Sequence, residues 1–533
     1  MQNVMAVRAA QSVGRPAARS RTGRLLVLVL LFLVGVIAAA GAALASDYYW
    51  GTFGITQPPL EVAANGARRI IRVPPGASIQ TALNRANPGD EIELQAGAVY
   101  KGVLKLPNKS GAEFITVRTS AVAQLPPADT RLDPKRHGAA LATILSNVQG
   151  QPAILAENGA HHFRFVGIEF GPTIQGYFNI IQIGTAEERT VDELPHHIEF
   201  DRTYVHGSRT EGQRRGIAAN GRHIKIANSY ISDIKREGEE SQAIAVWGGD
   251  GPIEITNNYL EAAAESILFG GAESRLGLVP GNATIRDNWM NKPLEWRGSK
   301  WVVKNFLEIK SGKRIDIERN LMTNNWAMAQ EGTGVLFRTG EDSGKGAIVE
   351  DILFADNIMR GSGSAITVFG GEGGGGRRLT IRNNVFEDIS ANKWEGRGFF
   401  IKSSTWDGLT IENNTVIHDG SITIGYGAPV RGLVFRNNIV FNNEYGFFGD
   451  GIGSGQVAIN RYYPGASIVG NILVGGRAAE YGRENFYPAS RSAIGFVAGS
   501  AGDYRLRSDS QFSRGGGGKG IGADLDPRTV GGK

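Results

Sequence analysis

The sequence predicts an all-β solenoid, in which short strands stack coil upon coil around one elongated core. The main observation is a phrase that occurs nine times, an alternating apolar strand followed by asparagine. Its asparagines recur at intervals of 24 to 37 residues, a spacing typical of solenoids. The 74 glycines and the scarcity of long helical patterns also favour many short strands joined by turns. The aligned asparagines are Asn228, Asn258, Asn288, Asn320, Asn357, Asn384, Asn414, Asn438 and Asn471.

These asparagines are expected at the tight turn between two sheets. The asparagine side chain tolerates the left-handed backbone region and can hydrogen-bond to neighbouring backbone. Stacked copies can also pair with each other from coil to coil. We therefore interpret the repeated asparagines as architecture and not as catalytic residues.

The start of the repeat region carries a short helix signal. Ile79, Ala82 and Leu83 fit one helical face, and residues 88–90 (Pro-Gly-Asp) end the pattern before the alternating strand at residues 91–94. This opening resembles that of right-handed parallel β-helix proteins of the pectate-lyase-like superfamily. The resemblance implies that the helix caps the open end of a solenoid over residues 70–512, followed by a terminal coil and disordered tail over 513–533.

The first 45 residues read as an export signal. They contain five arginines and no acidic residue, and an apolar run extends from Leu25 to Ala45. The run ends in Ala-Leu-Ala, which favours cleavage before Ser46, with an uncleaved membrane anchor as the alternative. Residues 46–69 then form a linker. Either outcome predicts an exported protein that is periplasmic, extracellular or anchored in the cell envelope, with membrane contact only through an uncleaved N-terminal segment.

Charge and composition narrow the possible partners. Subtracting the five N-terminal arginines from the formal charge of +5 leaves a neutral exported part. No global attraction for nucleic acid is therefore expected, and affinity for an acidic ligand must be local. The chain has no cysteine, which excludes disulfides, thiolate catalysis and cysteine metal sites. We expect a monomer.

One stretch concentrates outward-facing charge. In the strand Phe306-Leu307-Glu308-Ile309-Lys310, alternation places Glu308 and Lys310 outward if Leu307 and Ile309 face the core. Cations flanked by aromatic rings suit an acidic polysaccharide, because cations attract carboxylates and rings stack on sugar faces. We therefore predict that Trp247, Phe369 and Lys402 bind substrate. Aligning one strand from each coil gives an outward column of Trp247, Gly270, Lys310, Arg338, Phe369 and Lys402, with Glu308 beside it.

Two segments, Glu308 to Ser311 and Gly334 to Arg338, resemble the catalytic coils of polysaccharide lyase family six, the alginate lyase and chondroitinase B group. The resemblance implies that Lys310 is the catalytic base and Arg338 the acid or oxyanion partner. It also implies calcium as a cofactor. The calcium ligands would come from Glu308, Asn305, Glu265 and Glu261.

Two features depart from the family pattern. Glu308 lies only two residues before Lys310, closer than in the family, and Thr339 follows Arg338 where histidine is usual. The chemistry itself requires a base, and a positive charge or metal to stabilise the enolate formed beside the substrate carboxylate. A lysine base needs a lowered pKa, which Arg338 would favour and Glu308 would oppose.

The sequence leaves alternatives open. His206 is an alternative catalytic base, although a lone histidine at a strand end also fits a structural role. The charges at Lys310, Arg338 and Glu308 also fit simple solvated side chains. Our leading hypothesis is a lyase that cleaves a uronate-containing polysaccharide by β-elimination. The alternatives are a non-catalytic polysaccharide-binding or structural protein, and a glycoside hydrolase or epimerase, the hydrolase being disfavoured because no Asp-Asp pair occurs.

Overall fold

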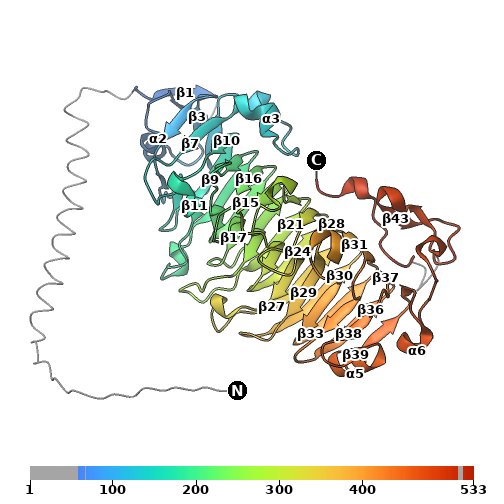
Figure 1. The fold of residues 1–533 in the computed structure, drawn as a ribbon. Coiled ribbons are helices and arrows are strands. Elements are labelled where there is room, and N and C mark those ends of the chain that lie inside the picture. The colour runs from blue at the N-terminus through green and yellow to red at the C-terminus, as the bar shows by residue number, and fades with distance from the viewer. Residues whose placement is uncertain (1–57, 66–67, 514–519, 533) are drawn as a thin grey trace, which may run out of the picture. The chain divides into compact units, whose positions relative to one another are not determined.

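Three long sheets of parallel strands wind along the chain, and each coil contributes one strand to each sheet (Figure 1). In one coil β9, β10 and β11 follow each other, and the next coil begins with β12, which pairs parallel to β9. The computed structural model describes residues 58–65, 68–513 and 520–532. The three stacked parallel sheets confirm the predicted right-handed parallel β-helix. The predicted signal segment 1–45 lies outside the described residues.

The first sheet has 15 strands. Its strands are β1 (Glu61–Asn65), β2 (Arg68–Val73), β3 (Glu91–Leu94), β6 (Ile115–Thr119), β9 (His161–Val166), β12 (His196–Asp201), β15 (Arg222–Ala227), β18 (Ile253–Thr256), β21 (Gly281–Arg286), β24 (Gly312–Glu318), β27 (Val349–Ala355), β30 (Gly376–Arg382), β33 (Trp406–Glu412), β36 (Val430–Arg436) and β40 (Ser467–Val469).

The second sheet has 13 strands. They are β4 (Val99–Lys101), β7 (Ala142–Leu145), β10 (Ile168–Phe170), β13 (Tyr204–His206), β16 (Tyr230–Ile234), β19 (Tyr259–Ala262), β22 (Trp289–Asn291), β25 (Leu321–Asn325), β28 (Ile358–Ser362), β31 (Val385–Ile389), β34 (Thr415–His418), β37 (Ile439–Phe441) and β41 (Ile472–Val474).

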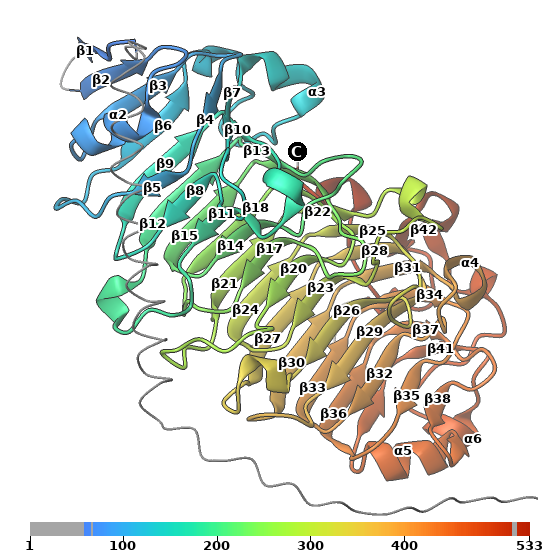
Figure 2. The ribbon, with the colours of Figure 1, turned by 60° about the vertical axis from the view of Figure 1, so that its left-hand side comes forward.

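The third sheet also has 13 strands, and Figure 2 shows them side by side in chain order. They are β5 (Leu104–Leu106), β8 (Ile154–Ala156), β11 (Asn179–Ile183), β14 (Arg215–Ala219), β17 (Gln242–Val246), β20 (Glu265–Phe269), β23 (Asn305–Ile309), β26 (Thr333–Arg338), β29 (Ser364–Phe369), β32 (Ile401–Ser404), β35 (Thr423–Gly425), β38 (Phe447–Gly449) and β39 (Gly453–Ser454).

The core is a stack of apolar side chains that repeats from coil to coil. In the first sheet Ile255 pairs with Ile285, which pairs with Ile317, and all three are fully buried. Side chains of successive residues along a strand point to opposite faces, so the neighbours of these buried residues in each strand lie on the outer face. The same hydrophobic column therefore fixes both the strand register and the outward positions on which a site can be built.

The helix α2 (Ile79–Arg85) caps the solenoid at its N-terminal end, as predicted. Ile79, Ala82 and Leu83 are buried against the core, and the Ser78 side chain accepts a hydrogen bond from the Thr81 N–H. Such a cap covers strand edges that would otherwise pair with another chain. The other described α-helices are α3 (Pro134–His137), α4 (Ala391–Trp394), α5 (Gln456–Tyr462) and α6 (Ala478–Tyr481). Within the described ranges, no helix combines the length and the apolar character needed to cross a membrane.

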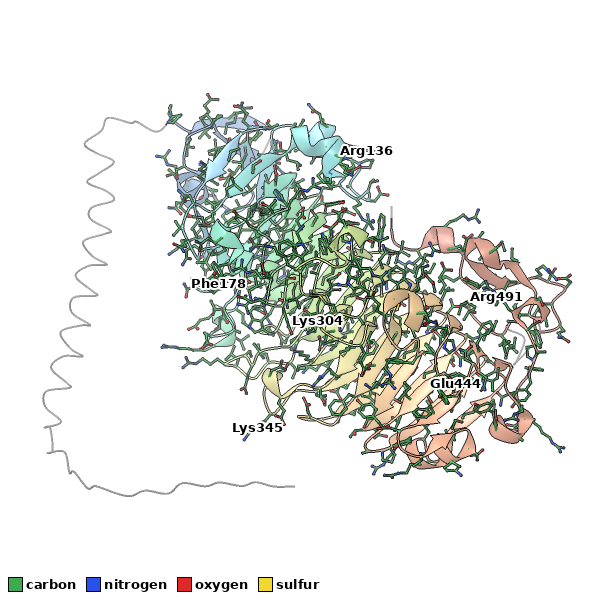
Figure 3. The ribbon with its side chains drawn as sticks, in the orientation of Figure 1. Arg136, Phe178, Lys304, Lys345, Glu444 and Arg491 are labelled. Atoms are coloured by element: carbon green, nitrogen blue, oxygen red, sulfur yellow. The ribbon has the colours of Figure 1, made fainter. Side chains whose placement is uncertain are left out.

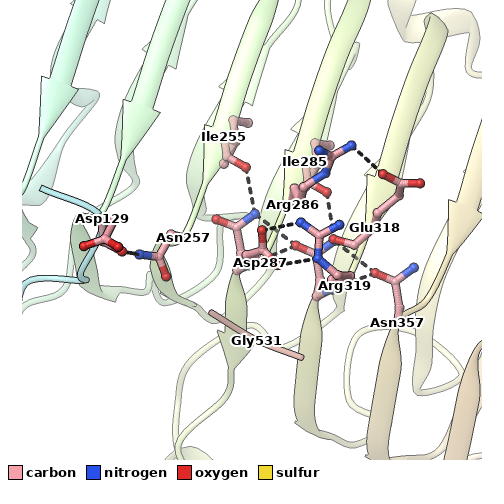
Figure 4. A network of polar contacts seen from close by, with 12 residues as sticks. Asp129, Ile255, Asn257, Ile285, Arg286, Asp287, Glu318, Arg319, Asn357 and Gly531 are labelled. Carbon is pink, nitrogen blue, oxygen red and sulfur yellow. Dashed lines mark hydrogen bonds and ion pairs between the residues drawn. The ribbon is translucent and has the colours of Figure 1, made fainter. Parts of the chain in front are cut away.

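The asparagines form a continuous buried ladder, part of which is seen in Figure 4. The Asn320 Oδ1 accepts from the backbone N–H and the Nδ2 of Asn288, both at 3.0 Å. The Asn320 Nδ2 donates in turn to the Asn357 Oδ1 at 3.0 Å and to the Ile285 carbonyl at 2.9 Å. The ladder runs from Asn258 onward through the predicted positions and continues to Asn485.

Two details of the predicted ladder are wrong. Asn228 is displaced by one residue, because Ser229 occupies the ladder position and its N–H donates to the Asn258 Oδ1. The left-handed conformation belongs to the residue before each ladder asparagine, as at Asp287 and Arg319. These two side chains lie outside the turn, where Arg319 donates to Asp287 at 2.8 and 2.7 Å (Figure 4).

Both ends of the solenoid differ from the predicted boundaries. The strand β1 pairs antiparallel with β2, ahead of the predicted start at residue 70. At the other end, residues 520–532 pack along the second sheet and do not form a free tail. Leu525 and Val530 are buried against Ile358 and Val385, and the Gly531 N–H donates to the Arg319 carbonyl. The antiparallel pair β42 (Phe496–Ala498) and β43 (Asp503–Leu506) precedes this segment.

Candidate active site on the third sheet

The structure brings Lys310 and Arg338 to equivalent places on neighbouring coils. Ile309 pairs with Phe337 in the parallel ladder, and each cation directly follows one of these buried residues. Both side chains therefore leave the third sheet on its outer face. Adjacent coils are separated by roughly 4.8 Å, a distance that one sugar ring can span.

The predicted outward column is correct at Phe369 and wrong at Lys402. Arg338 pairs with Phe369, but Phe369 then pairs with Ser404. Lys402 pairs with Thr367 and so belongs to the column of Glu308. The prediction correctly took Ile401 as an inward residue. Ile401 pairs with Ile366, however, so each outward residue of β32 lies one outward position away from its predicted partner. Lys402 still reaches the same part of the surface.

A cleft of about 400 Å³ opens beside these cations, over β26, β29, β32 and β35. Its floor is the outer face of the sheet, and side chains from flanking loops form its walls. The Phe369 and Tyr426 rings lie parallel, with centroids 6.3 Å apart. The cleft is lined by Gln330, Glu331, Thr333, Leu336, Arg338, Thr367, Phe369, Glu372, Lys402 and Tyr426.

Each cation of the surface is paired with a carboxylate carried by a loop. The Lys310 Nζ lies 2.7 Å from the Asp342 Oδ2, and the Arg338 Nη2 lies 3.2 Å from the Glu372 Oε1. The Lys402 Nζ donates to both oxygens of Glu331 at 2.8 Å. The three carboxylate side chains are 27 to 47% exposed, so water and ligands can reach these pairs.

Aromatic rings contact two of these cations. The Arg338 guanidinium lies 5.7 Å from the centroid of the Phe369 ring, and the Lys402 ammonium lies 5.4 Å from that of Tyr426. Burial raises the pKa of Tyr426 to about 12, so its hydroxyl stays protonated. The cleft thus combines cations, flat rings and a neutral hydroxyl, a composition suited to a charged sugar chain.

Next to the cleft along the third sheet lies a buried ionic cluster centred on Lys304, which is labelled near the centre of Figure 3; its Glu308 pairs with Leu336 of the cleft. The Lys304 Nζ lies 2.7 Å from the Glu240 Oε1, 2.7 Å from the Glu265 Oε1 and 3.5 Å from the Glu308 Oε2. Glu265 and Glu308 are almost fully buried. Asn305 adjoins them, because Asn305 pairs with Glu265 in the ladder.

The electrostatics of the cluster follow from burial and neighbouring charge. Burial acts to lower the pKa of Lys304, but Glu265, Glu308 and Glu240 outweigh burial and raise it. Burial raises the pKa of Glu265 above its ordinary value. At Lys310 burial again acts downward, but the charges of Glu308 and Asp342 leave the pKa above its ordinary value. In the resting protein Lys310 is therefore a cation.

The residues predicted to bind calcium do not fit a calcium ion in this arrangement. Two of their oxygens, Glu308 Oε2 and Asn305 Oδ1, are buried without a hydrogen bond, and the Glu265 Oε1 has the Lys304 ammonium at 2.7 Å. Such oxygens suit calcium. The Lys304 ammonium, however, already lies within ion-pair distance of the two carboxylates, and a second cation placed among them would be repelled by it. We therefore assign no chemical step to calcium.

Two predicted site residues lie elsewhere. His206 and Glu261 belong to β13 and β19 of the second sheet, whereas the cleft is on the third. The His206 Nε2 lies 3.0 Å from the Glu169 Oε1, and Glu261 accepts from the Tyr259 hydroxyl and the Asp233 N–H. Trp247 follows β17, two coils before Lys310, where its ring contacts Arg215 at 4.9 Å.

Sequence reasoning missed several residues that build the site. Lys304 directly precedes its strand, and Glu331, Asp342 and Glu372 lie in loops between strands, where the alignment of repeats predicts no position. Tyr426 follows a strand by one residue and was not aligned. The sequence offered one signal for the ionic cluster: Lys304 lies four residues before Glu308, and a bend in the chain can bring the two side chains together.

Comparisons with known proteins concern the fold. No protein-family model and no curated protein matches the chain. An alginate lyase from Paenibacillus sp. str. FPU-7 is similar at 14% identity and a TM-score of 0.42, over 60% of this chain and 96% of that one. The alginate lyase AlyGC, of family PL6, is similar at 15% identity and a TM-score of 0.46, over 87% of this chain. This chain spans 58% of the length of AlyGC. The surface adhesin PfbA of Streptococcus pneumoniae is similar at 12% identity and a TM-score of 0.37, over 64% of this chain and 82% of that one.

Proposed function

We propose that this protein is an exported lyase that cleaves a uronate-containing polysaccharide by β-elimination in the cleft on the third sheet. The observation that carries the proposal is the placement of Lys310 and Arg338 at equivalent positions of adjacent coils, beside a cleft with stacked rings and a third cation, Lys402. A uronate needs this set: cations for its carboxylate, rings for its sugar face, and a nitrogen base at the acidic carbon.

In the proposed reaction the substrate carboxylate pairs with Arg338, which disperses the negative charge that develops as the neighbouring carbon loses its proton. Lys310, in its neutral form, accepts that proton. The electron pair of the broken C–H bond forms the new carbon–carbon double bond, and the bond to the glycosidic oxygen breaks. That oxygen leaves with a proton from the solvent or from Lys310, giving one unsaturated and one saturated chain end.

The carboxylates in the cleft mark where substrate carboxylates would bind. Glu372 and Glu331, which line the cleft, place an oxygen 3.2 and 2.8 Å from Arg338 and Lys402, so a carboxylate of the ligand can reach the same geometry by displacing them. The exchange leaves the number of ion pairs at the surface unchanged. Affinity must then come from ring stacking and from several sugar units bound together.

A second candidate function is binding of the polysaccharide without cleavage. It is favoured by the raised pKa of Lys310, because a lysine held protonated by Glu308 and Asp342 is a good anion ligand and a poor base. The same cleft would then serve a surface protein that attaches to an acidic polymer.

One experiment separates these functions. The purified chain is incubated with alginate, pectate, chondroitin and bacterial exopolysaccharides, while ultraviolet absorbance of unsaturated uronates and retardation in polysaccharide-containing gels are both measured. Absorbance that rises on one polymer supports the lyase. Retardation without absorbance replaces the lyase by the binding function, new reducing ends without absorbance indicate a hydrolase, and absence of all three on every polymer contradicts both proposals.

A further inference from the structure

Five of the chain's eight histidines gather on three successive strands of the first sheet. His161 begins β9, His196 begins β12, and the register pairs these two residues directly. Their rings stack with centroids 4.6 Å apart and an interplanar angle of 4°. The remaining members are His162, His197 and His223, which stack in a second parallel row.

A backbone feature places consecutive histidines on the same face. His162 and His197 have φ angles of 58° and 53°, in the left-handed region. This conformation interrupts the usual alternation, so His161 and His162 both lie outside the core and Phe163 is buried. As a result the Nδ1 atoms of His161 and His162 are 2.7 Å apart, and those of His196 and His197 are also 2.7 Å apart.

The fold does not require histidine at these positions. The same left-handed position is occupied in later coils by Asn282, Arg314, Asp351 and Arg378. A left-handed non-glycine residue carries a conformational cost, and asparagine, aspartate and even arginine bear it at this position of later coils. Histidine in three consecutive coils is therefore better explained by what the imidazoles do together than by the demands of the turn.

We propose that His161, His162 and His196 form a binding site for a divalent metal ion of the zinc type. One ligand nitrogen from each of these residues lies within 4.8 Å of the others. Ligand nitrogens around a tetrahedral zinc ion, at about 2.0 to 2.1 Å from the metal, are separated by roughly 3.3 Å. Small rotations of the three side chains would bring their nitrogens from the present separations to that value.

The surroundings favour this class of metal and leave room for a further ligand. Imidazole is a ligand that zinc, copper and nickel prefer, whereas calcium and magnesium prefer oxygen. His161 and His196 border a hollow of about 400 Å³, which is also lined by His197, His223 and Asp192 from the loop before β12. Burial and mutual repulsion lower the pKa values of His162 and His196, the latter to about 4, which keeps these rings in the neutral form that binds metal.

This site is separate from the cleft. In the first sheet, the histidine group ends at β15, and the strand that follows Lys310 in the chain is β24. The strands β18 and β21 lie between these two. Three strand spacings of roughly 4.8 Å each therefore separate the two places along the solenoid. The inference does not depend on the proposed lyase activity.

The test is a zinc titration of the full chain after treatment with a chelator, followed by calorimetry and by metal analysis after gel filtration. We expect one zinc ion per chain, and visible absorption bands of a four-coordinate ion when cobalt replaces zinc. His162→Asn should weaken binding about tenfold or more and is compatible with the fold, because Asn282 occupies the same backbone position. His196→Gln should do the same.

The matched control is His137→Ala, a histidine on α3 outside the group. It should leave the zinc affinity unchanged. The proposal is overturned if the chain retains no zinc, or if His162→Asn and His196→Gln bind zinc as tightly as the original chain while their circular dichroism is unchanged. Stoichiometric binding that also persists in both variants would place the metal elsewhere and reject this site.

Discussion

The asparagine ladder and the Lys304 cluster are two buried polar systems of the same solenoid, and they are built on different principles. In the ladder every Asn320-type side chain finds donors and acceptors in the coils before and after it. In the cluster, the carboxylates of Glu265 and Glu308 depend on one ammonium group, and buried oxygens of Glu308 and Asn305 lack a hydrogen bond. A regular satisfied network stabilises the fold, whereas an irregular and incompletely satisfied one costs stability and calls for a functional explanation.

The largest effect should come from the surface that the cluster supports. Lys310→Ala removes the proposed base, so we expect the rate of product formation to fall about a hundredfold or more, with little change in polymer binding. The measurement is ultraviolet product absorbance together with gel retardation. The matched control is Lys345→Ala, an exposed lysine at the margin of the β-helix (Figure 3). Full activity of Lys310→Ala would remove this residue from the mechanism.

The next effect concerns the cluster itself. Lys304→Ala leaves Glu265 and Glu308 buried without their cation, and breaking such an ion pair from one side costs about 3 to 5 kcal/mol. The midpoint of urea unfolding should fall accordingly. The double variant Lys304→Ala with Glu308→Gln should recover part of the loss. Equal stability of the single variant and the original chain would show that the ammonium is dispensable.

A smaller loss is expected in the ladder. Asn320→Ala removes the acceptor of the Asn288 N–H and the donor to the Ile285 carbonyl, which costs about 2 kcal/mol or somewhat more. The comparison is Asn460→Ala, where an exposed asparagine on α5 is changed in the same way. Both are followed by urea unfolding. If Asn320→Ala were no more costly than Asn460→Ala, the ladder would not be a main source of stability.

The contrast also explains what the sequence could reveal. The ladder and the outward places of Lys310 and Arg338 follow from periodicity, because each coil repeats the same constraint, whereas the capping role of α2 was implied by the resemblance to β-helix proteins. Lys402 was assigned to the wrong column because alternation fixes the face of a residue and not the register: Ile401 pairs with Ile366 and not with Val368. Glu331 and Glu372 could not be predicted because they belong to loops whose paths depend on tertiary contacts. The His-His pairs at 161 and 196, one coil apart, were a readable signal for the histidine group.

The proton affinity of Lys310 gives a prediction of a few-fold effect. A base acts only when deprotonated, and the raised pKa of Lys310 places its deprotonation above the ordinary range for lysine. Lyase activity should therefore rise with pH throughout the alkaline range. Asp342→Asn removes one of the charges that raise this pKa, so the rising limb should move to lower pH. A limb that stays in place would show that Asp342 does not control the base.

The smallest effect, no change at all, is expected when metal chelators are added to the lyase assay. Lys304 already supplies the positive charge among Glu265 and Glu308, and the histidine group lies on other coils, so neither calcium nor zinc is needed for turnover. Lys304→Ala should behave differently, because it leaves Glu240, Glu265, Glu308 and Asn305 as an oxygen-rich site that calcium can occupy. Calcium should then raise the unfolding midpoint of Lys304→Ala and leave that of the original chain unchanged. Loss of turnover on chelation of the original chain, restored by calcium, would show that the ammonium does not replace a metal ion.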